Sequence, residues 1–349
     1  MGCSLSGLNA LYGATNGGGD VWVNENRFRI VKLLGDGGGS AFTYLVKEVA
    51  DADADGAGSG LSGKLLKVPS HGSDHGMYAM KKVLVGTEEE LELVREEIRV
   101  SSLFSHPNLL PLLDHAIIPV TGQERAFNHE AYFLFPVHLN ASTLLDKAKI
   151  METKKLFFST LTVLHIFRQV CAGLEHMHSH DPPYAHNSIK PDNIMISPRP
   201  GQEPLAILMD FETTRPGKKA IRSRAEALQL QEWAAEHCSE PFRAPELWNC
   251  PSYADIDQRT DIWSLGCTLY AMMYGISPFE YVVADTGGSL QLAIMNAQIK
   301  WPPIPKDPFP ESLRQFVVWM LQPLPTIRPF IGDIIIHVDK LLSKISSER

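Results

Sequence analysis

The sequence predicts an α+β fold, in which a small strand-rich part up to residue 135 precedes a mostly helical remainder. Loosely alternating apolar residues at 27–34 and 78–85 predict strands, and a glycine cluster follows the first of them. Apolar residues at helical spacing recur after residues 87 and 159. A polar loop at 184–193, followed by an apolar run that ends in an acid, indicates a phosphate-handling site.

That polar loop reads Tyr-Ala-His-Asn-Ser-Ile-Lys-Pro-Asp-Asn, and the run at 205–209 leads to Asp210-Phe211-Glu212. Asn193 and Asp210 supply two oxygen ligands of the kind that Mg²⁺ prefers. Lys190 supplies one ammonium for a terminal phosphate. The layout is the one needed to hold a metal-bound polyphosphate.

Composition excludes several other classes of protein. The chain has 349 residues, 44% of them hydrophobic, so it can bury one large core or two lobes. Its net charge of -8 argues against a nucleic-acid surface. Five cysteines without a C-x-x-C pattern indicate reduced thiols in a cytosolic compartment. No apolar run of about 18 residues and no signal-peptide core are present.

The first residues, Met-Gly-Cys-Ser-Leu-Ser, fit the acceptor for N-myristoylation at Gly2. Cys3 beside it is placed for palmitoylation, and two acyl chains hold a membrane where one binds only marginally. A start that carries glycine by chance is the alternative. We expect residues 1–24 to form an acylated tether.

The strand-rich part continues through several recognisable segments. Strand, glycine turn and strand run through Val49, and a polar low-complexity insert occupies 49–77. A strand at 78–85 carries Lys81 and Lys82, which point to opposite faces because strand side chains alternate. Thr87 and Glu90 form a capping box that opens a helix.

Later segments leave alternatives open. An apolar strand at 130–135 is broken by Pro136, and a core helix begins at Ser159. His176, His178 and His180 suggest a metal cluster, but only the first and third share a helix face, so a helix end is favoured. The helical pattern at 222–237 fits a substrate platform or, as the safer interpretation, a packed surface helix.

Seven motifs resemble, in their order, those of eukaryotic protein kinases; besides the segments above, they include Arg243-Ala-Pro-Glu246, Asp261-Ile-Trp-Ser-Leu-Gly266 and Ile327-Arg328-Pro329. The resemblance implies a bilobal kinase fold with the N-lobe at 25–135 and the hinge and C-lobe at 136–349. The resemblance implies transfer of the ATP γ-phosphoryl group to Ser or Thr of proteins, with Mg²⁺ or Mn²⁺. The implied site residues are the glycine-loop residues Gly35 and Gly37, the phosphate-binding Lys81 and its helix partner Glu97, the gatekeeper Phe135, the adenine-facing backbone of Pro136, Val137 and His138, the catalytic Lys190, and the metal ligands Asn193 and Asp210. Asp261 is implied to hold the catalytic loop, and Arg328 to pair with Glu246.

Three further stretches, the Met-Gly-Cys start, residues 227–238 and residues 263–275, resemble the myristoylated and palmitoylated serine/threonine kinase of the Numb-associated kinase group. This narrower resemblance implies a location on the cytoplasmic face of a Golgi or plasma membrane, with a cytosolic fraction. The expected partners are ATP, a protein substrate or scaffold partner, and the membrane. No nucleic acid is expected.

The chain departs from the kinase pattern at three positions. Ser188 replaces the catalytic Asp, a loss on the order of 10²–10⁴-fold in rate. Glu212 replaces a glycine, which permits a backbone geometry closed to other residues, and its carboxylate is expected near Mg²⁺ and the phosphates. Two like charges about 5 Å apart repel each other by about 3 kcal/mol at an effective dielectric constant of about 20. Asn187 replaces the arginine that usually receives an activation-loop phosphate. We therefore expect impaired catalysis, and the alternative is a pseudokinase that serves as a membrane-tethered, nucleotide-binding scaffold.

Overall fold

The computed structural model describes residues 19–37, 39–49, 76–120, 127–138 and 140–347. These residues divide into two compact units. The first takes the described residues up to 103 and those from 111 to 138. The second takes residues 104–110 and everything described from 140 onward. The predicted N-lobe and C-lobe boundary at 135 and 136 thus differs by a few residues and by the short 104–110 segment.

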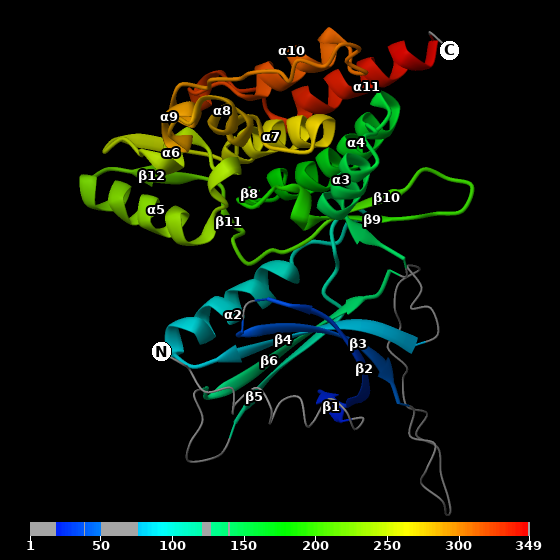
Figure 1. The fold of residues 1–349 in the computed structure, drawn as a ribbon. Coiled ribbons are helices and arrows are strands. Elements are labelled where there is room, and N and C mark those ends of the chain that lie inside the picture. Colours follow the sequence, from blue (N-terminus) through cyan, green and yellow to red (C-terminus); the bar gives the residue numbers. More distant parts are fainter. Residues whose placement is uncertain (1–18, 38, 50–75, 121–126, 139, 348–349) are drawn as a thin grey trace, which may run out of the picture. The chain divides into compact units, whose positions relative to one another are not determined.

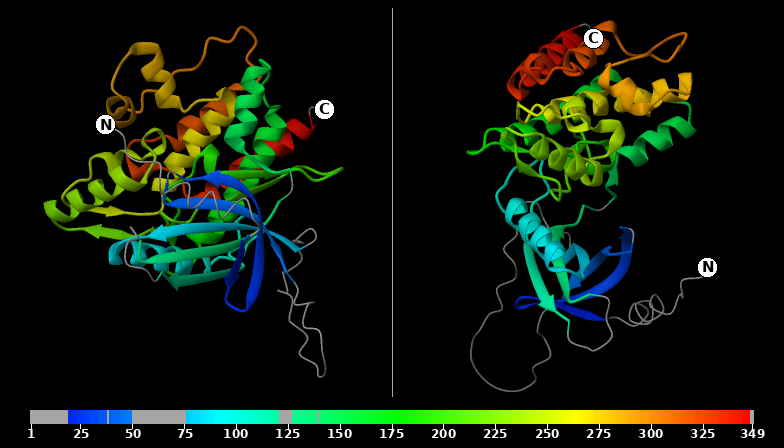
Figure 2. Two further views of the ribbon diagram at one scale, coloured as in Figure 1. Left: turned by 60° about the horizontal axis from the view of Figure 1, so that its bottom comes forward. Right: turned by 90° about the vertical axis from the view of Figure 1, so that its left-hand side faces the viewer.

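The first unit is a six-stranded antiparallel sheet with the order β1-β2-β3-β4-β6-β5 and one described helix, α2, which lies across the sheet (Figures 1 and 2). Its elements are β1 (Asp20–Val23), β2 (Asn26–Asp36), β3 (Ala41–Glu48), β4 (Met77–Val85), α2 (Glu88–Ser101), β5 (Asp114–Pro119) and β6 (His129–Pro136). The predicted capping box is present, since the Thr87 hydroxyl accepts from the Glu90 amide.

Strand alternation divides the apolar side chains of this sheet between two cores. One cluster includes Phe28, Tyr78 and Met80. The other includes Phe133 and joins the sheet to the buried face of α2. The charged face of α2 stays exposed, as expected for an amphipathic helix.

The last residues assigned to the expected tether belong to the sheet instead. Residues 20–23 form β1 rather than part of the tether, because Val23 is fully buried and Asp20 accepts hydrogen bonds from Arg27 and Arg29. Residues 1–18, with Gly2 and Cys3, lie outside the described residues, as does 50–75 of the predicted insert.

The second unit is mostly helical. Its helices are α3 (Leu144–Thr153), α4 (Thr160–His178), η2 (Pro191–Asn193), α5 (Arg224–His237), η3 (Glu240–Phe242), α6 (Pro245–Trp248), α7 (Thr260–Tyr274), α8 (Pro278–Thr286), α9 (Leu290–Met295), α10 (Glu311–Met320), η4 (Pro325–Ile327) and α11 (Ile331–Ser347). Its short strands are β7 (Ser142–Thr143), β8 (Tyr184–Ala185), β9 (Ile194–Ser197), β10 (Leu205–Leu208), β11 (Arg215–Pro216), β12 (Lys219–Ile221) and β13 (Ala254–Ile256).

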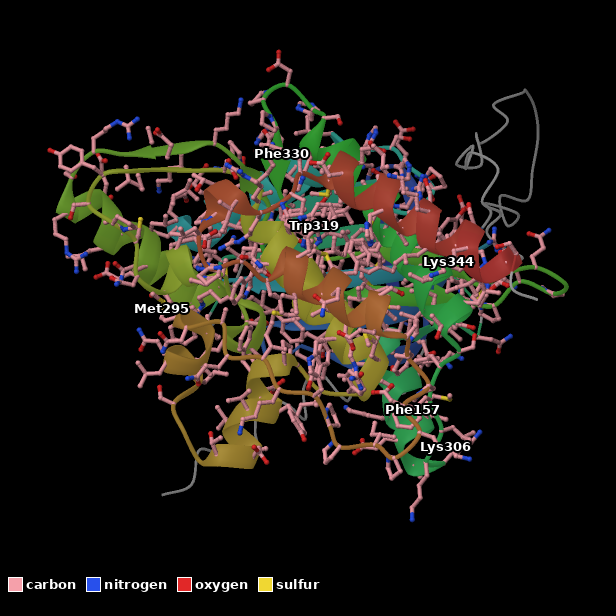
Figure 3. The ribbon with its side chains drawn as sticks, turned by 90° about the horizontal axis from the view of Figure 1, so that it is seen from above. Phe157, Met295, Lys306, Trp319, Phe330 and Lys344 are labelled. Atoms are coloured by element: carbon pink, nitrogen blue, oxygen red, sulfur yellow. The ribbon has the colours of Figure 1, made fainter. Side chains whose placement is uncertain are left out.

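Helix α7 forms the centre of this unit, since every residue from Thr260 to Met273 is buried. Helix α4 begins where the sequence predicts, with the Ser159 side chain as its cap. Figure 3 shows α10, which carries Trp319, beside α11, which carries Lys344; the ring centroids of Trp319 and His337 lie 5.4 Å apart. None of the described helices is long and apolar enough to cross a bilayer.

A buried ion pair joins distant parts of the second unit. The Arg328 guanidinium donates two hydrogen bonds, of 2.7 and 2.6 Å, to the Glu246 carboxylate. It also donates to the carbonyl of Gln322 and lies 5.2 Å from the ring of Trp263. This is the pair that the resemblance implies, and its burial means that either charge alone would lack solvation.

We predict that Arg328→Ala lowers the free energy of unfolding by about 3–5 kcal/mol, because Glu246 keeps a buried, unpaired charge. Denaturant unfolding of the purified chain measures this. Arg95→Ala is the matched control, since its ion pair with Glu92 is exposed, and it should change stability by no more than about 0.5 kcal/mol. Equal losses in both variants would contradict the prediction.

Candidate active-site residues

Lys81 and Glu97 form an ion pair in the first unit. Lys81 Nζ lies 2.7 Å from Glu97 Oε1, and the ring centroid of Phe133 lies 5.3 Å from the same nitrogen. Glu97 is 6% exposed although α2 is rich in exposed glutamates. Its role could not be derived from composition, and only the position relative to the kinase pattern singled it out.

Lys82 points to the other face of β4. Its ammonium lies 2.9 Å from Glu130 Oε1 and 5.6 Å from the centroid of the Tyr132 ring. The predicted alternation of the two lysines is therefore present. Lys81 faces helix α2 and pairs with Glu97, whereas Lys82 pairs with Glu130 of the neighbouring strand β6.

The glycine turn joins β2 to β3. The Gly37 amide donates to the carbonyl of Ala41 at 2.8 Å, and the Gly39 amide donates to Asp36 Oδ1 at 3.2 Å. Gly39 has a φ of +95°, which favours glycine. A Cβ at Gly37 would lie 3.2 Å from Ala41, whereas one at Gly35 would meet nothing within 4 Å.

The predicted gatekeeper, Phe135, and the residue after it lie at the end of strand β6. Phe135 stacks on Phe133 with ring centroids 6.4 Å apart, and Pro136 is the last residue of β6. Val137 and His138 come directly after the strand. Proline has no amide hydrogen to donate, so any amide donor from this segment would have to come from Val137 or His138.

The loop at 184–193, to which the kinase resemblance assigns the catalytic role, is tied to α7 by one carboxylate; it is called the catalytic loop below. Asp261 is fully buried and accepts from the amides of His186 and Asn187, both at 2.8 Å. His178 Nε2 lies 2.9 Å from the same carboxylate. The resemblance to kinases implied that Asp261 holds this loop. The sequence indicated His178 only as a residue at a helix end, so its contact with Asp261 was not predicted.

Asn187 adopts a left-handed backbone conformation, with φ +61°. Asparagine reaches this region more readily than most residues. Its side-chain amide donates to the carbonyls of Ala185 and Thr213, both at 3.2 Å. The bond to Thr213 connects the loop to the segment after Asp210, and it needs no phosphate group on the activation loop.

Ser188 and Asn193 contact each other in a buried arrangement. Asn193 Nδ2 donates to both the carbonyl and the hydroxyl of Ser188, each at 2.9 Å. With its nitrogen engaged, the amide of Asn193 offers Oδ1 as its remaining oxygen, which is a suitable metal ligand. The Ser188 hydroxyl thus accepts a hydrogen bond within the loop, at the position where the kinase pattern has a carboxylate.

Lys190 reaches another segment of the second unit. Its Nζ donates to the hydroxyl of Ser239 at 2.6 Å, just after α5. Ser239 was not predicted from the sequence, because nothing local distinguishes this serine from others in the chain. Its position shortly before Ala244-Pro245-Glu246, which contains the implied partner of Arg328, was the available signal.

Asp210 has a φ of +71° and an exposed side chain, so its carboxylate is free to ligate a cation. Phe211 anchors the motif, since it is 3% exposed and packs on Phe104 and His186 with centroids 6.2 and 5.6 Å away. Asn193 Oδ1 and the Asp210 carboxylate are oxygen donors of the kind that Mg²⁺ prefers.

Glu212 does not adopt the backbone conformation that would demand glycine. It is absent from the described non-glycine residues with positive φ, and its side chain is exposed. Its carbonyl accepts from Arg215 Nη1 at 2.9 Å. The predicted backbone conflict is therefore missing, and the exposed carboxylate can turn toward solvent.

The three histidines at the end of α4 have different polar or stacking partners, although His176 and His180 both lie edge-on to the ring of Phe104. His176 stacks on His106 at 5.4 Å, and His180 Nδ1 lies 2.9 Å from the carbonyl of Pro182. His178 contacts Asp261. In the described part of the chain, no group of three or more His, Cys, Asp or Glu side chains is placed to hold a metal ion.

Comparison with known proteins identifies relatives along nearly the whole chain. The family model for the protein kinase domain matches residues 54–338. Serine/threonine-protein kinase 16 of Homo sapiens is 32% identical over 329 residues, which cover 94% of this chain and 92% of that protein. Serine/threonine-protein kinase ppk13 of Schizosaccharomyces pombe is 28% identical over 350 residues, covering 91% of this chain and 92% of the relative.

We predict that stability falls as the pH drops below about 6.5, because burial lowers the pKa of His186 beneath its unfolded value. Asp261 and Asp210 oppose this shift, and His178 adds to it. In this window the unfolded chain binds the extra proton, so His186 contributes a slope of at most about 1.4 kcal/mol per pH unit.

Unfolding measured at several pH values tests this with His186→Asn, whose carbonyl oxygen can accept from the Ser188 amide as Nδ1 does at 3.2 Å. The variant should show a flatter pH dependence below 6.5. His115→Asn, at an exposed histidine, should keep the wild-type slope. An unchanged slope in His186→Asn would refute the assignment.

Proposed function

The chain belongs to the protein kinase family, and we propose that it transfers the ATP γ-phosphoryl group to serine or threonine slowly, from the cytoplasmic face of a membrane. The observation that carries this proposal is the Ser188–Asn193 contact. It keeps the metal-binding amide oriented although the catalytic acid is absent.

The proposed roles follow from the groups that each residue presents. Lys81, oriented by Glu97, neutralises charge on the α- and β-phosphates. Asn193 Oδ1 and Asp210 hold Mg²⁺, which neutralises the phosphate oxygens when bound. Lys190 neutralises charge on the transferred group. Phosphoryl transfer depends mainly on such positioning and charge neutralisation, and these four side chains are present.

Ser188 accounts for the slow rate. A hydroxyl cannot take the proton of a substrate hydroxyl as a carboxylate does, and this one already accepts from Asn193. Transfer would then rely on water to remove the proton. Glu212 adds less to the defect than its charge implies, because its side chain is exposed and its backbone is unstrained.

A nucleotide-binding scaffold is the second candidate. It is favoured by the bonds from the Asn187 side chain to the carbonyls of Ala185 and Thr213, which fix the loop without a phosphorylation step. A scaffold would bind ATP yet transfer nothing.

We predict that Ser188→Asp raises phosphate transfer by about 10²–10⁴-fold, because a carboxylate restores the proton acceptor. Radiolabelled transfer to the chain itself and to a generic basic protein, with Mg²⁺ or Mn²⁺, measures the rate. Asp210→Ala is the blank, since it removes a metal ligand. Wild-type transfer above this blank supports the slow kinase.

If the wild type transfers no phosphate and Ser188→Asp does, the scaffold is favoured and the nucleotide site is intact. Silence in all variants would place the defect elsewhere. Glu212→Gly then tests the metal motif, and ATP-dependent thermal stabilisation reports whether nucleotide still binds. A chain that gains nothing from ATP would contradict both candidates.

Membrane attachment is proposed from the first residues alone, through myristate on Gly2 and palmitate on Cys3. Each buried CH₂ contributes about 0.8 kcal/mol, so one chain gives reversible binding and two give stable attachment. The Golgi or the plasma membrane is the proposed location. The cytosolic fraction would be chain that lacks one of the two acyl groups.

We predict that Gly2→Ala moves the expressed protein from the membrane fraction to the soluble fraction of cells, and that Cys3→Ser does so partially. Fractionation with metabolic labelling by alkynyl fatty acids measures both. Ser4→Ala serves as the control and should leave the distribution unchanged. Equal membrane association of all three variants would disprove acylation as the anchor.

A further inference from the structure

A pocket of about 390 Å³ lies within the second unit, and none of the residues given a catalytic role above lines it. Figure 1 shows the elements around it, where α5 lies near α6 and the short strands β11 and β12. Its volume is at the lower end of the roughly 300–1,000 Å³ of small-ligand sites. The lining residues are Ala185, Asn187, Arg215, Pro216, Gly217, Lys218, Lys219, Leu230, Trp233, Leu247, Ile256 and Thr260.

The charge on this lining has one sign. Arg215, Lys218 and Lys219 contribute cations, and none of the lining residues is Asp or Glu. Within the described residues, none of these three side chains forms an ion pair; Arg215 Nη1 donates only to the carbonyls of Glu212 and Thr214. The chain as a whole carries a net charge of -8, so this local concentration of unneutralised cations stands out against an acidic protein.

The pocket also has an apolar floor. Leu230 is 6% exposed and Leu247 4% exposed, and Ile256 lies on β13 opposite Lys219 of β12. The Arg215 guanidinium lies 5.9 Å from the ring centroid of Trp233. Cations at the rim around apolar and aromatic side chains suit a ligand that is both anionic and partly apolar.

The basic rim is held in place by its backbone. Pro216 fixes its own φ, and the Gly217 amide donates to the carbonyl of Pro183 at 2.7 Å. A Cβ at Gly217 would lie 3.0 Å from Gln258 Cβ and 3.4 Å from the Ala185 nitrogen, so a larger residue would crowd this turn. Lys218 and Lys219 are therefore presented by a fixed turn, which lowers the entropic cost of binding.

The neighbouring strand favours a peptide over a small anion. In the described residues β12 pairs with β13 alone, so its second edge has no strand partner. An exposed strand edge can add an extended peptide. Lysine on an edge also discourages unspecific pairing, and here it would admit acidic segments while repelling basic ones.

From these observations we propose that the pocket bounded by Arg215, Lys218, Lys219, Leu230 and Trp233 is a docking site for an acidic peptide segment of a partner protein. An apolar or aromatic side chain of the segment enters the floor, and flanking carboxylates face the three cations. The site would recruit a substrate or a scaffold partner, so it stands whether or not the chain transfers phosphate.

The test uses a fluorescein-labelled peptide, Glu-Asp-Glu-Asp-Phe-Asp-Glu-Asp-Glu, and fluorescence polarisation with the full chain. Two matched peptides carry Gln and Asn in place of the acids, or Ala in place of Phe. We expect only the first peptide to bind well. Lys218→Glu combined with Lys219→Glu should weaken its binding by at least about tenfold.

Lys340→Glu combined with Lys344→Glu is the control of equal charge, because these exposed lysines of α11 lie outside the pocket lining. It should change the affinity by no more than about twofold. Trp233→Ala should remove the preference for Phe over Ala in the peptide, and Trp233→Phe should retain it. Thermal unfolding of each variant establishes that it is folded.

Three outcomes would overturn the proposal. The first is no binding of the acidic Phe peptide up to about 1 mM. The second is equal loss in the two lysine pairs, which would mean attraction by overall charge alone. The third is binding of phosphatidylserine vesicles, and not of peptide, that depends on Lys218 and Lys219, which would assign the cations to a membrane surface.

Discussion

The buried carboxylate of Asp261 is the constraint on which the catalytic loop depends. A charge with no access to water is costly unless it accepts strong hydrogen bonds, and two backbone amides and His178 provide them. The loop from His186 onward cannot shift without removing these donors. The positions of Ser188, Lys190 and Asn193 follow from this attachment to α7, the most deeply buried helix of the second unit.

The same attachment explains how loss of one chemical group can leave the others in place. Ser188 lacks the carboxylate of the kinase pattern, yet its carbonyl and hydroxyl both accept from Asn193. Asn187 lacks a guanidinium, yet its amide connects the loop to Thr213. The hydrogen bonds that hold this loop therefore do not depend on the carboxylate and the guanidinium of the kinase pattern.

The sequence predicted the elements because their signals are local. Strand alternation separated Lys81 from Lys82, and capping residues placed the starts of α2 and α4. Partners distant along the chain were found only through the resemblance to kinases, as for Glu97, or were missed, as for Ser239 and His178. Two errors had physical causes: β1 formed because Val23 could be buried, and Glu212 kept an ordinary backbone where a conflict was expected.

The ion pair between Glu246 and Arg328 also bears on how the second unit folds and opens. The two residues are 82 positions apart, so bringing them together closes a long loop, and that entropy must be lost before the pair contributes anything. Such a contact is expected to form after the local helices have joined. An interaction formed after the folding transition state slows unfolding without speeding folding. The pair would thus mainly slow the unfolding of the second unit. A longer lifetime of the folded state would also increase its resistance to proteases that cut the transiently opened chain.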